Sequence, residues 1–450
     1  MSEKEIRISP SVKEGQETAK EIQKAIDAVS NQGGGRVCLK AGTYVSTTIM
    51  LRNGVDFHLE KGALLKAHTT LADYPEVGVA ASNKDQSQQH LIVAWEVEGV
   101  SITGEGVIDG QDQAFWEPCQ KKEDRPYGIF RYVVIDNPRN RPSPLVQIVK
   151  SSGVKIQGVT VTSPPGWGLH IFESEDVAVE GITVLGDPYG PNTDGIGINA
   201  SRRVRVHGCR VNTGDDAIIV KATNPGSLCE SVVVSDCIVA SNCAGLGLGA
   251  DVEGTVRDIL FNNCVVEKSL RMMQVEMWFA GTVERAIFSN ITGRTFPDEE
   301  VENERPIYVD IQQFIRKDPN LGVVRDLIFR DIFCESRGRI LLTAQDGAKI
   351  ENLSLEGITV RVPEVEDPTV TVPASTSLQL SNHSPESRIC RAGVVADNIS
   401  GLSLQRVAYH WPEVNDVPMH GLYLRKVEDL NDQSPQLKSS HPNMERTETP

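Results

Sequence analysis

A short alternating motif recurs through most of the chain and constrains its fold more than any other feature. The pattern is apolar-x-apolar-x-[Gly/Asn/Asp]-apolar-x-apolar, as in Val154-x-Ile156-x-Gly158-Val159-x-Val161. The second apolar position of the successive copies is occupied by Ile102, Ile156, Val179, Val206, Val234, Phe261, Phe288, Phe329, Leu355 and Leu404. Most copies follow one another with a period of about 27 residues, which is typical of solenoids. The two widest spacings, Ile102 to Ile156 and Leu355 to Leu404, are each expected to hold two turns, and that from Phe288 to Phe329 one turn with a long loop.

The alternation within each copy predicts β-strands, because residues i and i+2 of a strand share one face. The stretches between copies show no helical periodicity, so the strands stack without crossover helices, as in a parallel β-helix. Cys209, Cys237 and Cys264 each lie three positions after their anchor and are expected to stack as buried thiols. The 450 residues therefore predict one elongated, all-β domain.

The two ends of the chain differ from the repeat. Ala19–Ser30 carries apolar residues at helical spacing, stops at three glycines (33–35), and is expected to cover the open end of the solenoid. The predicted organisation is a flexible N-terminus (1–15), a single β-helix domain (16–426) with its N-terminal cap at about 16–70, and a flexible polar tail (427–450).

The composition limits the classes of partner. The net charge is −16, so the chain is not expected to bind nucleic acid, whose phosphates need positive partners. No apolar run reaches the roughly 18 residues of a membrane span, and the first residues lack a secretory signal. The expected location is the cytoplasm as the sequence stands, or a secreted or periplasmic one if a leader has been removed. None of the nine cysteines has a C-x-x-C spacing, and no metal or cofactor is expected. The oligomeric state stays open.

Two acidic motifs interrupt the apolar ladders one coil apart. They are Asn192-Thr193-Asp194-Gly195 and Gly214-Asp215-Asp216-Ala217. Allowing for the Pro/Gly loop before Asn192, all three carboxylates can reach one face of adjacent coils, about 4.8 Å apart. Mutual repulsion is expected to raise the pKa of at least one of the three, as an acid catalyst requires. Paired carboxylates are the usual groups for glycoside hydrolysis, although Asp-Asp also caps turns or binds Ca²⁺.

These two motifs together resemble the signature of glycoside hydrolase family 28, the polygalacturonases and related pectin hydrolases. Trp167–His170 resembles the family's Trp-x-Leu-His turn, and the resemblance covers roughly residues 15–410. It implies a right-handed parallel β-helix and hydrolysis with inversion. It also implies that Asp215 protonates the leaving oxygen, and that Asp194 and Asp216 activate water.

The sequence departs from the family pattern at two places. Leu246 stands where the family has the His of Gly-His-Gly, and Met273 stands where it has the Lys of Arg-Ile-Lys, although Arg271 is kept. An Arg still binds a carboxylate through two hydrogen bonds, but one cation is lost. A polyanionic substrate needs local positive charge on an acidic chain. A substrate other than plain polygalacturonate is therefore favoured, such as another pectic linkage or a different sugar. Whether the two departures change the substrate or remove the activity stays open.

Other polar residues are candidates for binding the sugar. His170 either lines the sugar subsite or is a turn residue whose hydrogen bonds are satisfied within the protein. Lys221 either contacts the sugar or forms a salt bridge with Asp215 or Asp216. Gln274 and Glu276 either replace the missing Lys contact or lie on a solvated face. The candidate substrate-binding residues are Asn192, His170, Lys221, Arg271, Gln274, Glu276 and Tyr308, the last as a wall of the cleft.

Two other functions stay open: a uronate lyase or epimerase, and a non-catalytic carbohydrate-binding β-helix. The sequence leaves the glycan, the linkage and endo or exo action open. The long segments Gly110–Asn140 and Thr295–Glu304 could close the cleft into a pocket, which would suit exo action.

Overall fold

A computed structural model of the chain describes residues 4–78, 87–121, 130–295, 304–313, 320–364, 382–413 and 418–450. It divides into two compact units, and each is described by itself. Unit 1 comprises residues 1–219 and 232–242, and unit 2 comprises residues 220–231 and 243–450. The predicted single-domain organisation stays a prediction. Among the described residues, no helix combines the length and the apolar character needed to cross a membrane.

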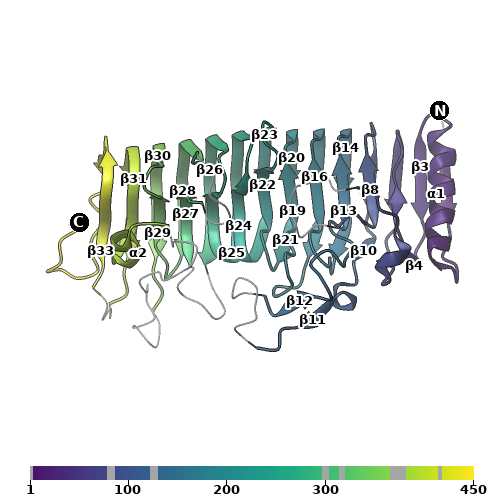
Figure 1. The fold of residues 1–450 in the computed structure, drawn as a ribbon, viewed down its shortest axis with the longest axis horizontal. Coiled ribbons are helices and arrows are strands. Elements are labelled where there is room, and N and C mark those ends of the chain that lie inside the picture. Colours follow the sequence, from purple (N-terminus) through teal and green to yellow (C-terminus); the bar gives the residue numbers. More distant parts are fainter. Residues whose placement is uncertain are drawn as a thin grey trace. The chain divides into compact units, whose positions relative to one another are not determined.

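The elements of unit 1 are mostly short strands (Figure 1). They are β1 (Glu5–Ile8), β2 (Glu14–Gly15), α1 (Gln16–Ser30), β3 (Gly35–Leu39), β4 (Gly42–Ser46), β5 (Ile49–Met50), β6 (Val55–Leu59), β7 (Ala63–Ala67), η1 (Leu71–Asp73), β8 (Ile92–Trp95), β9 (Ser101–Gly104), β10 (Val107–Asp109), η2 (Asp112–Ala114), β11 (Trp116–Pro118), β12 (Tyr132–Val134), β13 (Val146–Val149), β14 (Ser152–Gln157), β15 (Thr160–Thr162), β16 (Leu169–Phe172), β17 (Glu175–Glu180), β18 (Thr183–Leu185), β19 (Ile196–Asn199), β20 (Arg202–His207) and β21 (Arg210–Thr213).

Each coil of unit 1 places its strands in parallel register on the coils before and after it. The repeat anchors are direct partners: Ile102 lies beside Ile156, Ile156 beside Val179, and Val179 beside Val206. All four side chains are buried. The predicted parallel β-helix is confirmed, because the apolar positions of the motif form continuous ladders inside the coils.

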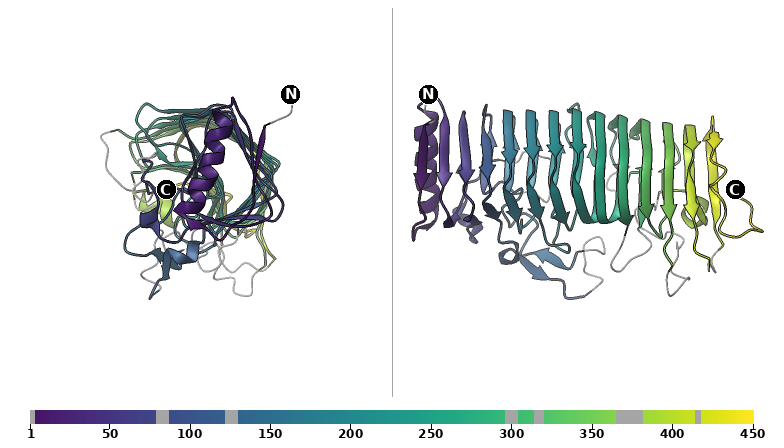
Figure 2. Two further views of the ribbon diagram at one scale, coloured as in Figure 1. Left: turned by 90° about the vertical axis from the view of Figure 1, so that its right-hand side faces the viewer. Right: turned by 180° about the vertical axis from the view of Figure 1, so that it is seen from behind.

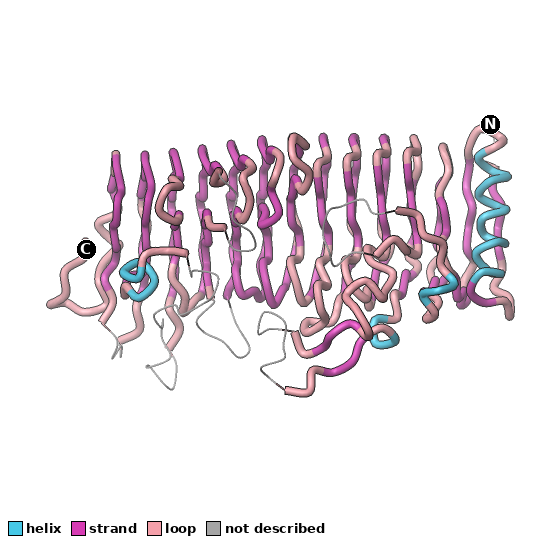
Figure 3. Tube along the Cα trace, viewed as in Figure 1, coloured by secondary structure: helices cyan, strands magenta, loops and turns pink. Residues whose placement is uncertain are grey.

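One spacing was misread from the sequence. Ile102 and Ile156 are neighbours in adjacent strands, so the segment between them forms one turn rather than the expected two. The additional residues leave the coil as an excursion that includes η2 and the antiparallel pair β11–β12, drawn below the coils in Figure 3. Part of the long loop 110–140 thus has its own secondary structure, and residues 122–129 of it lie outside the described residues.

The N-terminal cap is an amphipathic helix, as predicted. The apolar face of α1 buries Ile22, Ala25, Ile26 and Val29, and the helix lies across the first coils of unit 1 (Figure 2, left). Covering the apolar end of a solenoid in this way keeps it from pairing with other chains. The flexible N-terminus expected for residues 1–15 is corrected within residues 4–15, because β1 pairs with β3 and β2 pairs with β4.

Unit 2 also consists of parallel strands. Its elements are β25 (Thr255–Met277), β26 (Thr282–Thr295), β27 (Arg305–Ile311), β28 (Val323–Glu335), β29 (Ile340–Ala344), β30 (Ile350–Arg361), α2 (Pro385–Ile389), β31 (Ala392–Gln405), β32 (Ala408–His410), β33 (His420–Glu428), β34 (Asn431–Gln433) and β35 (Thr447–Glu448); β22 (Ile218–Ala222), β23 (Leu228–Ser235) and β24 (Ile238–Val252) carry residues of both units.

The core of unit 2 contains a ladder of aromatic rings. Phe261, Phe288 and Phe329 are register partners, with ring centroids 4.7 and 4.9 Å apart and 9° between the planes of each pair. Leu355 and Leu404 continue the repeat as direct partners. The segment between these two leucines therefore also forms one turn, not two, whereas the segment from Phe288 to Phe329 is one turn with a long loop, as expected.

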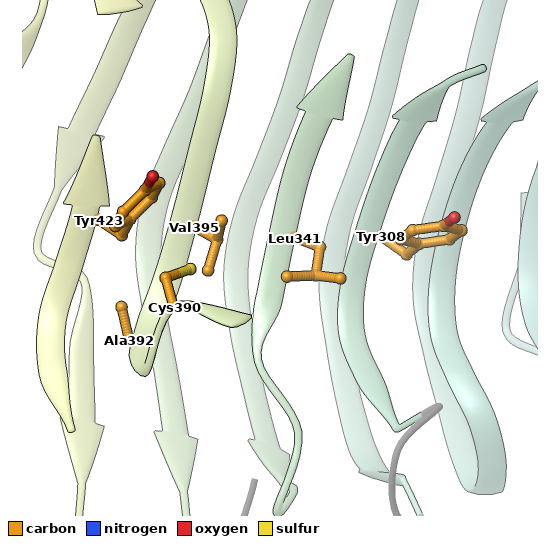
Figure 4. Close-up of a cluster of buried hydrophobic side chains, with 6 residues drawn as sticks. All are labelled: Tyr308, Leu341, Cys390, Ala392, Val395 and Tyr423. Carbon is orange, nitrogen blue, oxygen red and sulfur yellow. The ribbon is translucent and has the colours of Figure 1, made fainter. Parts of the chain in front are cut away.

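The outer face of the unit 2 strands carries a second ladder. Tyr308, Leu341, Val395 and Tyr423 are register partners on β27, β29, β31 and β33. Figure 4 shows these side chains in one row, with Cys390 from the end of α2 packed beside them. This part of the sheet is thus covered by the segment that contains α2.

The expected flexible tail at residues 427–450 is also corrected. β34 pairs with β31 and β35 pairs with β33, while Leu437 and Ser434 are almost fully buried. Although this segment is mostly polar, a few of its side chains are buried against the last coil. All nine cysteines are free thiols, and Cys209, Cys237 and Cys264 are buried, as predicted.

Candidate active site

The three candidate catalytic carboxylates lie together in unit 1. The amide of Gly195 donates to the carbonyl of Asp216 (2.9 Å), and the amide of Ile196 donates to the carbonyl of Ala217 (2.9 Å). These two bonds join adjacent coils and set Asp194 level with the pair Asp215–Asp216. Asp194 and Asp216 are 4% and 7% exposed, and Asp215 is half-buried.

A network of short contacts fixes the two acidic turns to each other. The Thr193 Oγ1 atom accepts a hydrogen bond from the Gly214 amide (2.9 Å) and donates to the Asp187 carbonyl (3.1 Å). A side chain at Gly214 would meet the Thr193 hydroxyl at 2.8 Å and the Asp187 carbonyl at 2.7 Å. The glycine of the second motif is therefore required by close approach of the first motif.

Asn192 acts directly on the carboxylate of Asp215. Its backbone has φ 51°, a left-handed conformation that Asn tolerates. From there its Nδ2 donates to Asp215 Oδ2 (3.2 Å), while Asp215 Oδ1 accepts from the Asp216 amide (3.0 Å). Both oxygens of this carboxyl are thereby oriented by the two motifs, which is the preorganisation that a proton-transfer group needs.

A buried arginine anchors the turns that carry the site. The guanidinium of Arg141 donates to the carbonyls of Pro138 (3.0 Å), Pro165 (2.7 Å) and Pro191 (2.5 Å), and the side chain is fully buried. Pro191 directly precedes Asn192 in the chain. Arg141 therefore positions the loop that leads into the site.

His170 is held by buried polar neighbours on the adjacent strands. Its Nδ1 lies 3.1 Å from Gln147 Oε1, and its Nε2 lies 3.4 Å from Asn199 Nδ2. The indole of Trp167 lies edge-on to the ring, with centroids 4.9 Å apart. Gln147 and Asn199 were not predicted from the sequence. Each is a single polar residue in an otherwise apolar strand, and this is the only sequence feature that could have indicated them.

The remaining predicted binding residues lie in unit 2. Lys221 Nζ is 3.6 Å from the Asp251 carboxylate. Arg271 Nη1 donates to Gln274 Oε1 (2.7 Å) and lies 3.3 Å from Glu276 Oε2. Gln274 and Glu276 are 2% and 1% exposed, so they orient Arg271 and do not lie on a solvated face.

The two departures from the family pattern fill the core. Leu246 and Met273 are fully buried, and Met273 lies beside Ile307 in the β25–β27 register. Strand alternation places Gln274 on the face opposite to Met273, and its register partner there is Tyr308. Tyr308 is 2% exposed, and its ring centroid lies 5.4 Å from the Arg271 guanidinium carbon.

Comparisons with known proteins identify the family to which this parallel β-helix belongs. The family model for glycosyl hydrolases family 28 matches residues 37–378. The chain belongs to this family.

The chain is similar to several family members over long stretches. A probable polygalacturonase of Vitis vinifera is 25% identical over 271 residues, which is 56% of this chain and 52% of that protein. The chain spans about half the length of the first curated relatives it matches. An exopolygalacturonase structure from Thermotoga maritima has TM-score 0.61 at 18% identity and covers 95% of this chain and 92% of that one. A family 28 exopolygalacturonase from Yersinia enterocolitica has TM-score 0.69 at 17% identity, covering 92% and 75%. At these identities the two structures show the shared fold.

Proposed function

We propose that this protein is an inverting glycoside hydrolase that cleaves O-glycosidic bonds in pectin-type polysaccharides or oligosaccharides. The observation that carries the proposal is the group Asp194, Asp215 and Asp216, brought level by hydrogen bonds between adjacent coils. Family membership and the polygalacturonase relatives support the same reaction class.

In the proposed reaction, the carboxylic acid of Asp215 donates its proton to the glycosidic oxygen as the bond to the anomeric carbon breaks. Asp194 and Asp216 accept a proton from a water molecule, whose oxygen attacks the anomeric carbon from the opposite face. Inversion requires about 6.5–9.5 Å between acid and base, leaving room for that water. The Asn192 amide holds Oδ2 of Asp215, which fixes the direction of proton transfer.

The substrate is proposed to be a pectic carbohydrate, on the strength of the family and of Arg271. The Arg271 guanidinium is pre-oriented by Gln274 and Glu276 and suits a planar, charged or polar sugar substituent. The products of the reaction will show whether the polysaccharide is cleaved at its end or in its interior.

The test is the release of reducing sugar from a panel of pectic polysaccharides by the whole chain and by Asp215→Asn. We expect Asp215→Asn to lower kcat by at least about 100-fold, because a positioned general acid contributes about 10²–10⁴-fold. Asp176→Asn is the matched control: Asp176 lies on the exposed surface of the same unit, paired with Arg203, and its left-handed backbone (φ 55°) accepts Asn.

Three outcomes would contradict the proposal. These are no sugar release from any pectic substrate, an unsaturated product that absorbs in the ultraviolet, which identifies a lyase, and binding without turnover that Asp194→Ala leaves unchanged.

A further inference from the structure

One outer face of the unit 2 strands carries a row of uncharged side chains. The row follows the left-handed corner residues Asn263, Asn290 and Asp331, whose φ values are 55°, 54° and 52°. Because side chains alternate along a strand, the second residue after each corner points away from the core. Register aligns these outward residues across β25, β26, β28 and β30 (Figure 1); they are Val265, Thr292, Phe333 and Thr359.

This uncharged row presents large apolar side chains to solvent. Phe333 is 53% exposed and Val265 is 38% exposed, while Thr292 is exposed and Thr359 is half-buried. An exposed aromatic residue in a row of apolar and threonine side chains, bordered by charges, is typical of a protein–protein contact surface.

The bordering charges form a second outward row, two residues further along each strand. Its members are Glu267, Arg294, Glu335 and Arg361, so the charge alternates in sign from β25 to β30. Glu335 is the register partner of both Arg294 and Arg361, and Arg294 Nε donates to the backbone carbonyl of Glu267 (2.8 Å). Within the part of the chain that the structure describes, no ion pair involves Arg294, Glu335 or Arg361.

The two rows are complementary to themselves. A two-fold axis parallel to the strands and passing between β26 and β28 reverses the order of the coils, and it brings each row opposite the same row of a second copy. Arg294 of one copy then faces Glu335 of the other, and Glu267 faces Arg361. Each of the four charges therefore meets an opposite charge across the axis.

We propose that this face of unit 2 binds a second copy of the chain in a symmetric dimer with antiparallel coils. Phe333 of each copy packs against Thr292 of the other at the centre, and the ion pairs lie along one side of this contact. The contact spans four short strand segments, so the dimer is weak and reversible, since stable interfaces bury about 1,200–2,000 Å². The alternating charges set its register and speed its formation. The dimer is independent of the proposed function.

The test measures the weight-average mass of the full chain by sedimentation equilibrium from about 1 μM to about 1 mM, the range of weak association. At low ionic strength we expect the mass to rise with concentration from that of one copy toward that of two. The rise should shrink as salt is added, because exposed ion pairs are screened.

Charge reversal tests the register of the two copies. Arg294→Glu and Glu335→Arg each bring like charges together across the axis and should weaken the dimer at least about 10-fold. An equimolar mixture of these two single variants should dimerise again, because the chain with two acidic residues faces the chain with two arginines. The variant that carries both substitutions in one chain should also recover.

Phe333→Thr tests the apolar centre of the contact. It keeps a residue that is favourable in strands and should weaken the dimer at least about 5-fold, because central aromatic residues supply much of the binding energy of an interface. Arg330→Glu is the matched control: Arg330 is exposed on the same strand but lies before the corner at Asp331, so its reversal should leave the association unchanged. Circular dichroism verifies that each variant is folded.

The proposal is overturned if the wild type stays monomeric over the whole concentration range, a result that needs no variant. It is also overturned if the chain associates equally well with Arg294→Glu or Phe333→Thr, or if the mixture of single variants stays as weak as each variant alone. None of these measurements uses sugar release, so a monomeric protein that hydrolyses pectic substrates would refute the dimer and leave the proposed function standing.

Discussion

Replacing Arg141 by Met tests how far the catalytic turns depend on this buried arginine. The substitution removes the donors to the carbonyls of Pro138, Pro165 and Pro191 and roughly conserves the apolar stem. Hydrogen bonds to a charged group contribute about 1.5–3 kcal/mol each. Removing the buried charge offsets part of this loss, and we expect a net destabilisation of about 3–5 kcal/mol, because three carbonyls lose their donor.

The same variant should lose activity beyond its loss of stability. Pro191 is followed by Asn192, which orients Asp215, and a displacement of about 1 Å at a catalytic group costs roughly 100-fold in rate. Urea unfolding followed by circular dichroism measures the stability, and initial rates of sugar release are taken where the variant is folded. Arg203→Gln, which breaks an exposed ion pair with Asp176, is expected to change neither. A folded Arg141→Met with wild-type stability and kcat would refute the reasoning.

Two further predictions concern unit 2. Phe288 is fully buried between Phe261 and Phe329. Phe288→Ala should therefore lower the free energy of unfolding by about 3–5 kcal/mol. A loss under about 1.5 kcal/mol in urea titrations would show that the ladder of phenylalanine rings adds little stability. Burial lowers the pKa of His383, but Asp310, whose Oδ1 lies 2.6 Å from Nε2, outweighs burial and raises it overall. A raised folded-state pKa stabilises the fold below the unfolded value of about 6.5, and the contribution is lost as pH rises through the folded value. The melting temperature of the wild type should therefore exceed that of His383→Gln most at low pH, with the difference shrinking above about pH 6.5; a difference that grows with pH would contradict the pairing.

The repeat could be predicted from the sequence because the apolar residue at each anchor position predicts a buried side chain. Ile156, Val179 and Val206 become register partners, since a strand with one buried face leaves only one register in which every apolar side chain points inward. The number of coils between anchors was not readable. The segment between Ile102 and Ile156 includes a two-stranded excursion that contributes nothing to the ladder, and a period alone does not separate an insertion from an additional coil.

The ends of the chain were misjudged for a similar reason. Residues 427–450 are polar and rich in Pro and Ser, which is typical of flexible tails. Their order depends on the preceding coil, which offers β31 and β33 as pairing edges. The few buried side chains, such as Leu437, are too sparse to form a pattern.

The acidic group of the site could be predicted because its members lie in two compact motifs. Arg271 could be predicted from its motif, whereas Arg305 and Arg339 of the same unit could not. Arg305 and Arg339 are far apart in the sequence and precede or begin ordinary apolar strands, so neither belongs to a motif. Their proximity results from the register of β27 and β29, which depends on the length of the loops between the strands. Likewise, the burial of Gln274 and Glu276 against Arg271 could not be predicted, because polar residues in a strand are compatible with a solvated face as well.

Proton NMR of the first product tests the central claim most directly. A pectic oligosaccharide is cleaved by the wild type in the spectrometer, and the anomeric signal is followed before mutarotation equilibrates it. If a single water attacks opposite Asp215, the new reducing end first appears with the configuration opposite to that of the cleaved bond. Asp215→Asn should form this product at least about 100-fold more slowly than the wild type, whereas Asp176→Asn should form it at the wild-type rate. A product that retains the original configuration, or one formed equally well by Asp215→Asn, would contradict the account.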